Sequence, residues 1–568
     1  MVANMSKRGN RRNLMNGIAN SIVFRRIVKW YSRKISSLML KARCYKSPIA
    51  LITPKLVIAV TLLMLGSLTM TLYTCMFKDS VYIIYASLAM IFSGLFVFLS
   101  PILHLSLLAR DRRNGLRKEL PYFLLYTCVL QHAGVSFYTS LSKLAKSHIF
   151  KYLKKEAMVF LRDIRFLGKD PLSALDNLAM NSPLKEFQDI IYGYTSLIKS
   201  GGDVAKYLEE KAKDLLKELK FKWKMYAERS VDVGESIASM FLMMVLLVLI
   251  GSIILPSDIL VIVVTLNFLV IPLIAILSLI LIDSLIPEIQ ETSRKYLKYL
   301  PVILTAAILC GWLSYNMLGN TSYALLTALL TFTLINGMLY YRDKKIINSI
   351  ENALPEFLRD LTEYRKMGFT PSQAITRLAW SKNYNRYFNK LLNNMATHIK
   401  MGLGLSKLPR TNSWLFNYIV FILSEIEESG GGSPAILEEL THFINEIKYA
   451  KVEARKSLFL YELIAYLTPV LLTFSLALIL RLVSSIFEVE TYTALGSILG
   501  LKLNFSEVFE LFKITIIEAS LVFALLTSKI IDFTLRNTIR GFLILLIAGL
   551  SFILAPYVSE HIFAFISS

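Results

Sequence analysis

The sequence contains one stretch twice: residues 120–145 read LPYFLLYTCVLQHAGVSFYTSLSKLA, and residues 354–379 read LPEFLRDLTEYRKMGFTPSQAITRLA. Each copy begins with Leu-Pro-x-Phe-Leu, has a Gly fourteen residues after the first Leu, and then has Leu-Ala at the same offset. An ordered series of matches at constant offset is typical of a duplicated domain. The sequence therefore predicts two copies of one unit.

The repeated unit has a helical pattern. The first copy has apolar residues at helical spacing, at Leu120, Phe123, Leu124, Tyr126 and Leu130. Pro121 and Pro355 suit the first turn of a helix. Gly134 and Gly368 suit the position after a helix end, where the backbone needs a positive φ. We therefore expect a small antiparallel helix bundle in which both glycines form structural turns.

The repeat continues beyond these stretches. PLSAL at 171–175 resembles GLSKL at 404–408, and Ser-Gly-Gly at 200–202 resembles Ser-Gly-Gly at 429–431. Residues 203–233 are rich in Lys, Glu and Leu and contain neither Gly nor Pro. This last stretch predicts one long helix that runs into the membrane.

Long apolar runs lie between and around the two copies. The mean hydropathy is +0.52 and 55% of the residues are hydrophobic, while 18% are charged, which is typical of membrane helices alternating with soluble segments. A span needs about 20 apolar residues. Nine runs are expected to span the membrane, near residues 56–77, 82–108, 236–255, 258–286, 300–318, 322–340, 459–482, 514–530 and 541–558.

The basic residues predict the orientation. Residues 1–55 contain many Lys and Arg but no Asp or Glu, and 110–234 and 341–458 are also rich in Lys and Arg. The loop 483–511 has Lys502 against four glutamates. The positive-inside rule places the basic segments in the cytoplasm and this loop outside. Nine spans then place the C-terminus outside.

The predicted fold class is an all-α integral membrane protein with about nine transmembrane helices and two duplicated cytoplasmic helix bundles. Its expected parts are a basic cytoplasmic segment, a transmembrane hairpin, the first bundle, four transmembrane helices, the second bundle and a C-terminal transmembrane part. These correspond to residues 1–55, 56–109, 110–234, 235–340, 341–458 and 459–568.

The duplicated set resembles the F domain of type II secretion systems, which also occurs in the platform proteins of type IV pili and of the archaellum. The resemblance rests on the LPxFL start, Gly134 or Gly368, the following helix with Leu-Ala, the later Ser-Gly-Gly and the spans after each copy. It covers most of residues 110–255 and 341–482. The paired spans and the extended C-terminal part look more like archaeal members, with an adhesive pilus favoured over the archaellum.

The resemblance implies a mechanism and partners. A cytoplasmic hexameric secretion ATPase would act beneath the platform, which would convert its motion into insertion of pilin or archaellin subunits into a filament. The platform would have no enzymatic activity. A homodimer is compatible with this arrangement, since a hexamer must meet a platform of lower symmetry.

The sequence carries no motif for a cofactor. No GxxxxGK[ST] occurs, and the glycine-rich stretch 429–433 has neither a following Lys nor a preceding strand. The four cysteines are scattered, without a CxxC pair, so no metal site is expected. We expect no cofactor and no catalytic residue.

Acidic residues distinguish the second copy. No Lys or Arg occurs between Arg410 and Lys448, and the first copy has Lys185 and Lys199 in the matching part. Five glutamates of this region are candidate partner-binding residues: Glu425, Glu427, Glu428, Glu438 and Glu439. We hypothesise that they contact the ATPase or its accessory proteins. The alternative is a solvated helix face.

Glu518 is the intramembrane polar candidate, because it lies within an apolar run. A carboxylate at membrane depth costs on the order of 2.5–3.5 kcal/mol and usually faces protein or water. Pairing with Arg481 or Lys529 is the structural interpretation. The functional hypothesis is that Glu518 receives the positive N-terminus of a pilin.

Residues 1–47 alternate basic and apolar residues, as in a helix lying on a membrane surface. Anionic lipid is therefore the expected partner, in preference to protein or nucleic acid. A transporter or channel is the alternative function, but it predicts several charges at the membrane midplane. A membrane enzyme predicts clustered His, Asp, Glu or Cys, and none of the six His is paired at ligand spacing.

Overall fold

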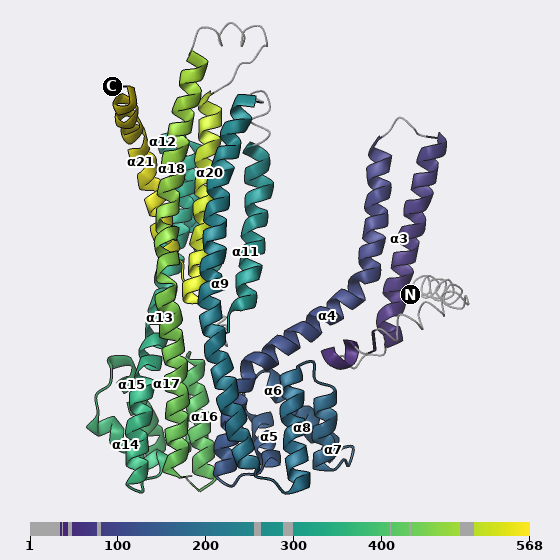
Figure 1. The fold of residues 1–568 in the computed structure, drawn as a ribbon, viewed down its shortest axis with the longest axis vertical. Coiled ribbons are helices and arrows are strands. Elements are labelled where there is room, and N and C mark those ends of the chain that lie inside the picture. The colour runs from purple at the N-terminus through teal and green to yellow at the C-terminus, as the bar shows by residue number, and fades with distance from the viewer. Residues whose placement is uncertain are drawn as a thin grey trace, which may run out of the picture. The chain divides into compact units, whose positions relative to one another are not determined.

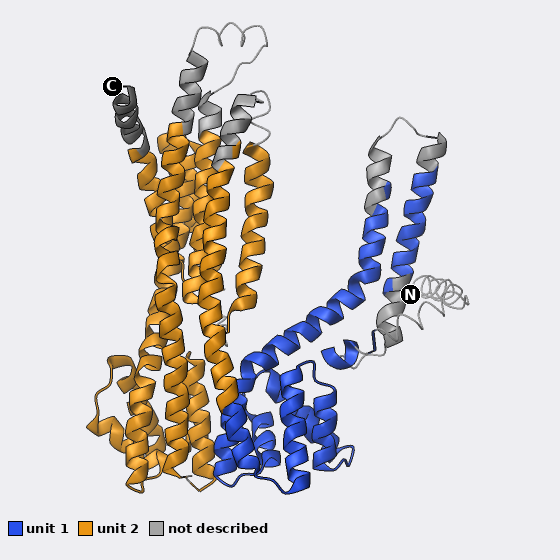
Figure 2. Ribbon diagram, in the orientation of Figure 1, with its two compact units in different colours: residues 1–212 blue, residues 213–568 orange. Residues whose placement is uncertain are grey.

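The computed structural model describes residues 35–36, 38–43, 48–76, 81–254, 263–287, 299–408, 410–430, 433–488 and 505–567. It contains helices and the turns between them, with no strand among these residues. Several predicted features lie outside the described residues: the basic residues 1–34, the turns 78–80 and 256–258, and most of 287–299 and 483–511. The chain divides into two compact units, residues 1–212 and 213–568 (Figure 2).

The chain is a multi-pass membrane protein. Six described helices are long and apolar enough to cross a membrane. They are Met90–His132, Val263–Leu285, Leu300–Leu318, Thr321–Lys366, Pro434–Leu478 and Glu510–Asp532. Two shorter apolar helices, Val57–Thr71 and Ile539–Leu554, lie near further predicted spans.

Unit 1 begins with a hairpin of α3 (Pro48–Met76) and α4 (Val81–His132), and α4 continues beyond the hairpin into a bundle (Figure 1). Bundle 1 consists of the last part of α4, four further helices and the start of α9. These elements are α5 (Phe137–Lys146), α6 (Tyr152–Arg165), α7 (Pro171–Met180), α8 (Lys185–Ser200) and α9 (Val204–Ile254). In its core the ring of Phe123 lies against the rings of Phe137 and Phe187.

The membrane part of unit 2 contains the C-terminal part of α9 and seven further described elements. They are η2 (Leu266–Val270), α11 (Ile271–Leu285), α12 (Leu300–Leu318), α13 (Thr321–Lys366), α18 (Phe459–Glu488), α20 (Phe505–Asp532) and α21 (Ile539–Ser567). Helices α12 and α13 form a hairpin that turns at Gly319, whose φ is +70°. Helices α18, α20 and α21 pack on one another, and α13 packs on α20 and α21.

Bundle 2 lies at the other end of α13 (Figure 1). It consists of the last part of α13 with α14 (Pro371–Ser381), α15 (Arg386–Lys400), η4 (Leu405–Lys407), α16 (Trp414–Glu428) and α17 (Pro434–Ser457). Its core includes Phe357, Phe388 and Phe416, whose rings form edge contacts. Because α17 leads into α18 through the single residue Leu458, bundle 2 is joined to the membrane helices at both ends.

Glycines with positive φ separate the helices of each bundle. In bundle 1 they are Gly134, Gly168 and Gly201, and in bundle 2 they are Gly368, Gly402 and Gly430. Gly168 follows Gly134 at the same distance along the chain as Gly402 follows Gly368. A Cβ built on any of the six would meet no atom within 4 Å, so the requirement for glycine is the backbone conformation alone.

Pro121 and Pro355 do not begin helices, and the sequence-based prediction of a first-turn position is wrong. Pro121 lies inside α4 and Pro355 lies inside α13, and both helices run without a break from the membrane part into the bundles. A proline inside a helix removes one backbone hydrogen bond. The helix continues because buried residues on both sides of the proline, such as Leu120 and Phe123 in α4, hold it in the bundle.

Candidate functional site

The acidic residues of bundle 2 do not form one open surface. Glu425 is only 7% exposed, on the core side of α16. Glu427 accepts a hydrogen bond from the Ser372 hydroxyl at 2.6 Å, and Glu438 forms an ion pair with Lys366 at 2.9 Å. Glu439 is half-buried, which leaves Glu428 and Glu438 as the exposed acids of the five. The interpretation as a single solvated helix face is therefore wrong for Glu425, and three of the five residues are at least partly buried within the bundle.

Gly134 and Gly368 each end the long helix of their bundle. The φ of Gly134 is +78° and that of Gly368 is +91°. The amide of the next residue donates back to a carbonyl five residues earlier, Val135 to Leu130 at 2.9 Å and Phe369 to Tyr364 at 3.1 Å. This is the hydrogen bond of a Schellman motif, which requires a left-handed residue at the glycine position.

Bundle 1 contains a buried ion pair that the sequence analysis missed. Arg112 of α4 and Glu156 of α6 are both buried, and their side chains are joined by hydrogen bonds of 2.9 and 3.1 Å. Arg43 also binds the Glu156 carboxylate and donates to the carbonyl of Lys155 at 2.9 Å. The third guanidinium nitrogen of Arg112, Nη1, donates to the carbonyl of Lys41 at 2.7 Å. Glu156 therefore fixes α4 and the segment 38–43 on α6.

The segment 35–43 is also held by apolar contacts. Ile35 and Met39 are buried together with Leu105 of α4. Partly buried side chains from α3 and α4 surround them, at Val57, Val60, Phe98 and Ile102. The segment thus has an apolar face against the base of the hairpin and a charged end against bundle 1.

A second charged group lies between α6 and α7. The Asp163 carboxylate is bonded by Asn177 at 2.8 Å, by Arg162 at 2.7 Å and by Lys169 at 3.4 Å. Burial raises the pKa of this carboxyl, but the hydrogen bonds from Arg162 and Asn177 outweigh burial and hold the pKa below its usual range. Asp163 therefore stays ionised and ties the end of α6 to α7.

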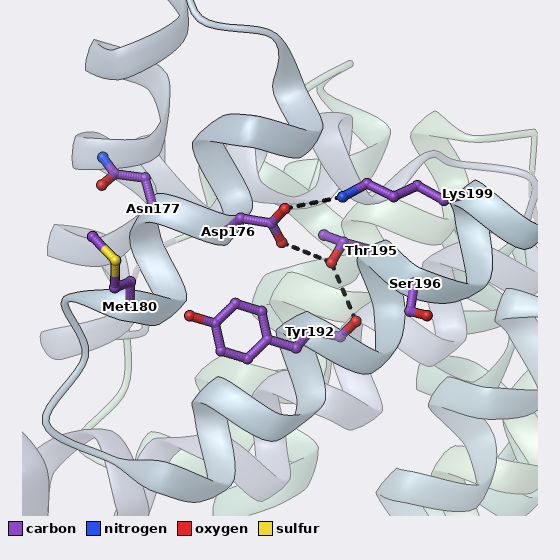
Figure 3. Close-up of a pocket in the computed structure, with 7 residues that line it drawn as sticks. All are labelled: Asp176, Asn177, Met180, Tyr192, Thr195, Ser196 and Lys199. Carbon is purple, nitrogen blue, oxygen red and sulfur yellow. Dashed lines mark hydrogen bonds and ion pairs between the residues drawn. The ribbon is translucent and has the colours of Figure 1, made fainter.

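A shallow hollow next to this group lies between α7 and α8 (Figure 3). The Asp176 carboxylate at its centre accepts hydrogen bonds from the Thr195 hydroxyl at 2.8 Å and from Lys199 at 3.2 Å. Met180 and Tyr192 line its rim. Both Asp176 oxygens thus have partners within the bundle, and the contacts stabilise the α7–α8 pair.

A polar cluster joins the membrane helices of unit 2 next to bundle 2. Arg540 of α21 binds Glu462 of α18 and Asp532 of α20, each at 2.6 Å. Thr538 donates to the carbonyl of Thr333 in α13 at 2.6 Å. These contacts connect four helices at one level, so that α18, which leads directly from bundle 2, is fixed to the C-terminal helices.

The turn between α20 and α21 is also fixed to α9. The hydroxyl of Tyr226 donates to the carbonyl of Ile530 at 2.6 Å. Phe533 has a φ of +59°, and its ring contacts the rings of Trp223 and Tyr226. A positive φ at a residue other than glycine costs on the order of 1–3 kcal/mol and persists only where the surroundings fix it. The three aromatic side chains provide that support here.

Glu518 lies half-buried on α20. One of its carboxylate oxygens is buried and has no hydrogen-bond partner among the described residues. Lys529, one of its two expected partners, pairs with Asp283 of α11 instead, and the side chain of Arg481 lies outside the described residues. One turn before Glu518, the Thr515 hydroxyl donates to Asn267 at 2.8 Å.

Comparison with known proteins relates the chain to secretion systems. A family model described as "Type II secretion system (T2SS), protein F" matches residues 123–256, which include bundle 1 from α4 onward and α9. An uncharacterized protein of Methanocaldococcus jannaschii is 22% identical over 417 residues, which cover 66% of this chain and 70% of that protein. No solved structure matches. The chain is thus a multi-pass membrane protein in which residues 123–256 are similar to protein F of type II secretion systems.

Proposed function

We propose that this protein is the membrane platform of a type IV filament or a type II secretion-like machine. In this role it couples a cytoplasmic hexameric secretion ATPase to the insertion of pilin subunits and to filament assembly. It carries out no catalysis and binds no cofactor. The observation that carries the proposal is the match of residues 123–256 to the type II secretion protein F model.

The proposal includes a duplication, in which bundle 2 is a second F domain. The order of elements supports it: α4, α5, α6, α7, α8 and α9 correspond to α13, α14, α15, η4, α16 and α17. The three positive-φ glycines of each bundle follow the corresponding helices, with η4 in place of the longer α7. In each case the first and last helices of the bundle lead to membrane helices.

In this proposal both bundles and the N-terminus lie in the cytoplasm and the chain crosses the membrane nine times. Its basic residues 1–55 bind anionic lipid, supported by the docking of segment 35–43 at the base of the α3–α4 hairpin. The two direct connections of bundle 2 to the membrane helices and the Arg540 cluster form a route for force from the cytoplasm to the C-terminal helices. The archaeal adhesive pilus is favoured over the archaellum, and the relative in Methanocaldococcus jannaschii accords with an archaeal system.

The proposal is tested by deletion and reconstitution. Cells lacking the protein are expected to keep mature pilins in the membrane and to form no filaments, and the wild-type gene should restore them. The purified full-length protein in nanodiscs should bind the purified secretion ATPase of the same cells. Normal filaments in the deletion strain, or no ATPase binding by the intact protein, would contradict the proposal.

Two residue groups give narrower tests of the same proposal. If Glu518 receives the N-terminus of a pilin, Glu518→Gln should reduce filament number while leaving ATPase binding unchanged. The substitution replaces the carboxylate, which has one buried and unpaired oxygen, by a neutral amide of the same size, so that only the charge is removed. The exposed acids Glu428 and Glu438 stay a prediction for an ATPase contact, tested by charge reversal at both positions.

A further inference from the structure

The two most exposed aromatic side chains of the described residues lie one in each bundle. Phe166 is 84% exposed and Trp380 is 78% exposed. Exposure of a single apolar side chain is ordinary. Here each aromatic side chain has an exposed aliphatic neighbour in its own bundle: Leu167, 59% exposed, accompanies Phe166, and Met401, 70% exposed, accompanies Trp380. Aromatic residues and Met are enriched in protein interfaces.

The two groups occupy corresponding places in their bundles. Phe166 and Leu167 directly precede Gly168, and Lys400 and Met401 directly precede the corresponding Gly402. Trp380 is twelve residues after Gly368, and Lys146 is twelve residues after Gly134. The aromatic residue and the cation have therefore exchanged positions: α6 ends at the aromatic in bundle 1, and α14 ends near it in bundle 2.

In bundle 2 the end of α14 meets the end of α15. The Lys400 ammonium group lies 4.6 Å from the centroid of the Trp380 ring, which joins the end of α15 to the end of α14. In bundle 1, α6 ends in the basic residues Arg162 and Arg165, and Phe166 follows directly. Each group thus combines an apolar centre with positive charge.

Both groups lie at the end of the bundle that is far from the membrane helices. The Ser381 hydroxyl is 3.3 Å from that of Tyr364, which is close to the last residue of α13. The first amides of α6 donate to Glu119 of α4. From that contact α6 runs to Arg165 and α4 runs to His132 over about the same length, so the two helices end at about the same level. Residues 341–366 of α13 follow the predicted span 322–340 and measure on the order of 40 Å at 1.5 Å per residue, so lipid headgroups are out of reach of the Trp380 group.

We propose that these two groups are equivalent docking sites for one protein partner that presents the same binding site several times. Each partner site would hold an aromatic and an aliphatic side chain in an apolar pocket bordered by carboxylates. The positive charge of both groups selects an acidic partner and opposes a second copy of this chain, which would bring like charges together. Two equivalent sites on one chain suit an oligomeric ring, and this inference rests on the proposed function, in which that ring is the secretion ATPase.

The test measures binding of the full-length protein in nanodiscs to the purified secretion ATPase hexamer. Trp380→Ala and Phe166→Ala are each expected to weaken binding by about tenfold, because buried aromatic anchors dominate interface energies. The double variant is expected to lose more than about a hundredfold, because linked sites reinforce each other. Lys400→Glu should also weaken binding and reduce its dependence on salt.

Two matched variants separate docking from folding. Tyr449→Ala removes another strongly exposed aromatic, on α17, and should leave the Kd unchanged. Trp380→Phe keeps an aromatic anchor and should retain most of the affinity. Equal Kd values for the wild type and the double variant would overturn the docking sites and leave the proposed function standing, whereas failure of the wild type to bind would overturn both.

Discussion

Bundles 1 and 2 have the same order of helices but different contacts between them. In bundle 1, α4 and α6 meet through the buried pair Arg112–Glu156. In bundle 2, α13 and the start of α15 meet through neutral donors: the Tyr384 hydroxyl donates to Asp360 at 2.9 Å, and the Asn385 amide donates to the carbonyl of Ser349 at 2.8 Å. At the positions that correspond to Arg112 and Glu156 stand Ile346 and Lys390, which cannot form an ion pair.

This difference shows which parts of the bundle carry the architecture and which parts vary. The helix order and the positive-φ glycines are common to both bundles, whereas the buried Arg112–Glu156 pair of bundle 1 has no counterpart at the matching positions of bundle 2. The Arg112–Glu156 pair also receives segment 38–43 through Arg43 and the carbonyl of Lys41. The Arg112–Glu156 pair therefore attaches segment 38–43 to bundle 1, and the structure describes no counterpart of this segment in bundle 2.

The largest expected effect comes from breaking the ion pair. Glu156→Gln leaves Arg112 and Arg43 facing a neutral group in a buried site, which should destabilise bundle 1 by about 3 kcal/mol. Hydrogen exchange of the α6 amides in nanodiscs should then be about a hundredfold faster. The corresponding change in bundle 2, Lys390→Gln at an exposed position, should leave α15 exchange unchanged. Unchanged α6 exchange in Glu156→Gln would show that the pair does not fix the bundle.

The glycine turns should give a smaller effect that is equal in the two bundles. Gly134→Ala and Gly368→Ala force a Cβ into the left-handed region, at a cost of about 1–2 kcal/mol each. Hydrogen exchange at the ends of α4 and α13 measures it. Gly404→Ala is the matched control, because Gly404 has a φ of −64° and should tolerate a side chain. Unequal effects at the two turns would argue against a common architecture.

Loss of the tyrosine contact should cost less still, and only in bundle 2. Tyr384→Phe removes the hydrogen bond to Asp360 and should destabilise bundle 2 by about 1 kcal/mol. The change makes bundle 2 more like bundle 1, where the buried Phe150 occupies the corresponding position. Burial and the bond to Asp360 raise the pKa of Tyr384, so the phenol stays a donor at neutral pH. Exchange of the α14–α15 amides measures the effect, and no change there would contradict it.

The smallest effect is a pH dependence of bundle 1 near Asp163. Its pKa is lower in the folded bundle than in the unfolded chain, where an Asp has a pKa of about 3.9. The contribution of Asp163 to stability is therefore complete above that pH and is lost as the pH falls through the folded pKa. Wild-type α6 should lose protection against exchange more steeply below about pH 4 than Asp163→Asn. Parallel curves for the two proteins would contradict the lowered pKa.

The sequence was most informative where local chemistry decides the structure. Gly134 and Gly368 stand at helix ends and have positive φ, and the predicted helix 203–233 is part of the unbroken helix α9, which begins at Val204. The proline rule failed because it considers one turn at a time. Pro121 and Pro355 lie in helices that continue from the membrane part and are fixed by packing on both sides. Tertiary packing thus overrides the local preference of these two residues.

Contacts between distant residues left no signal that spacing could reveal. Arg112 and Glu156 are far apart along the chain, as are Glu462 and Arg540, and each residue alone reads as an ordinary charge in a helical stretch. The burial of Glu425 could have been predicted from the sequence, because Glu425 lies among apolar residues of α16 at helical spacing. A count of charges along the chain ignored that periodicity and therefore assigned Glu425 to a surface.

The most direct test of the account is the side of the membrane on which each bundle lies. Single cysteines at the exposed positions Lys185 and Asn393, one in each bundle, and at Asn320 in the α12–α13 turn would be introduced after replacement of the four natural cysteines. A membrane-impermeant maleimide applied to intact cells should label the cysteine at 320 alone, and lysis should expose those at 185 and 393. Labelling of one bundle in intact cells would place the two bundles on opposite sides and contradict the platform.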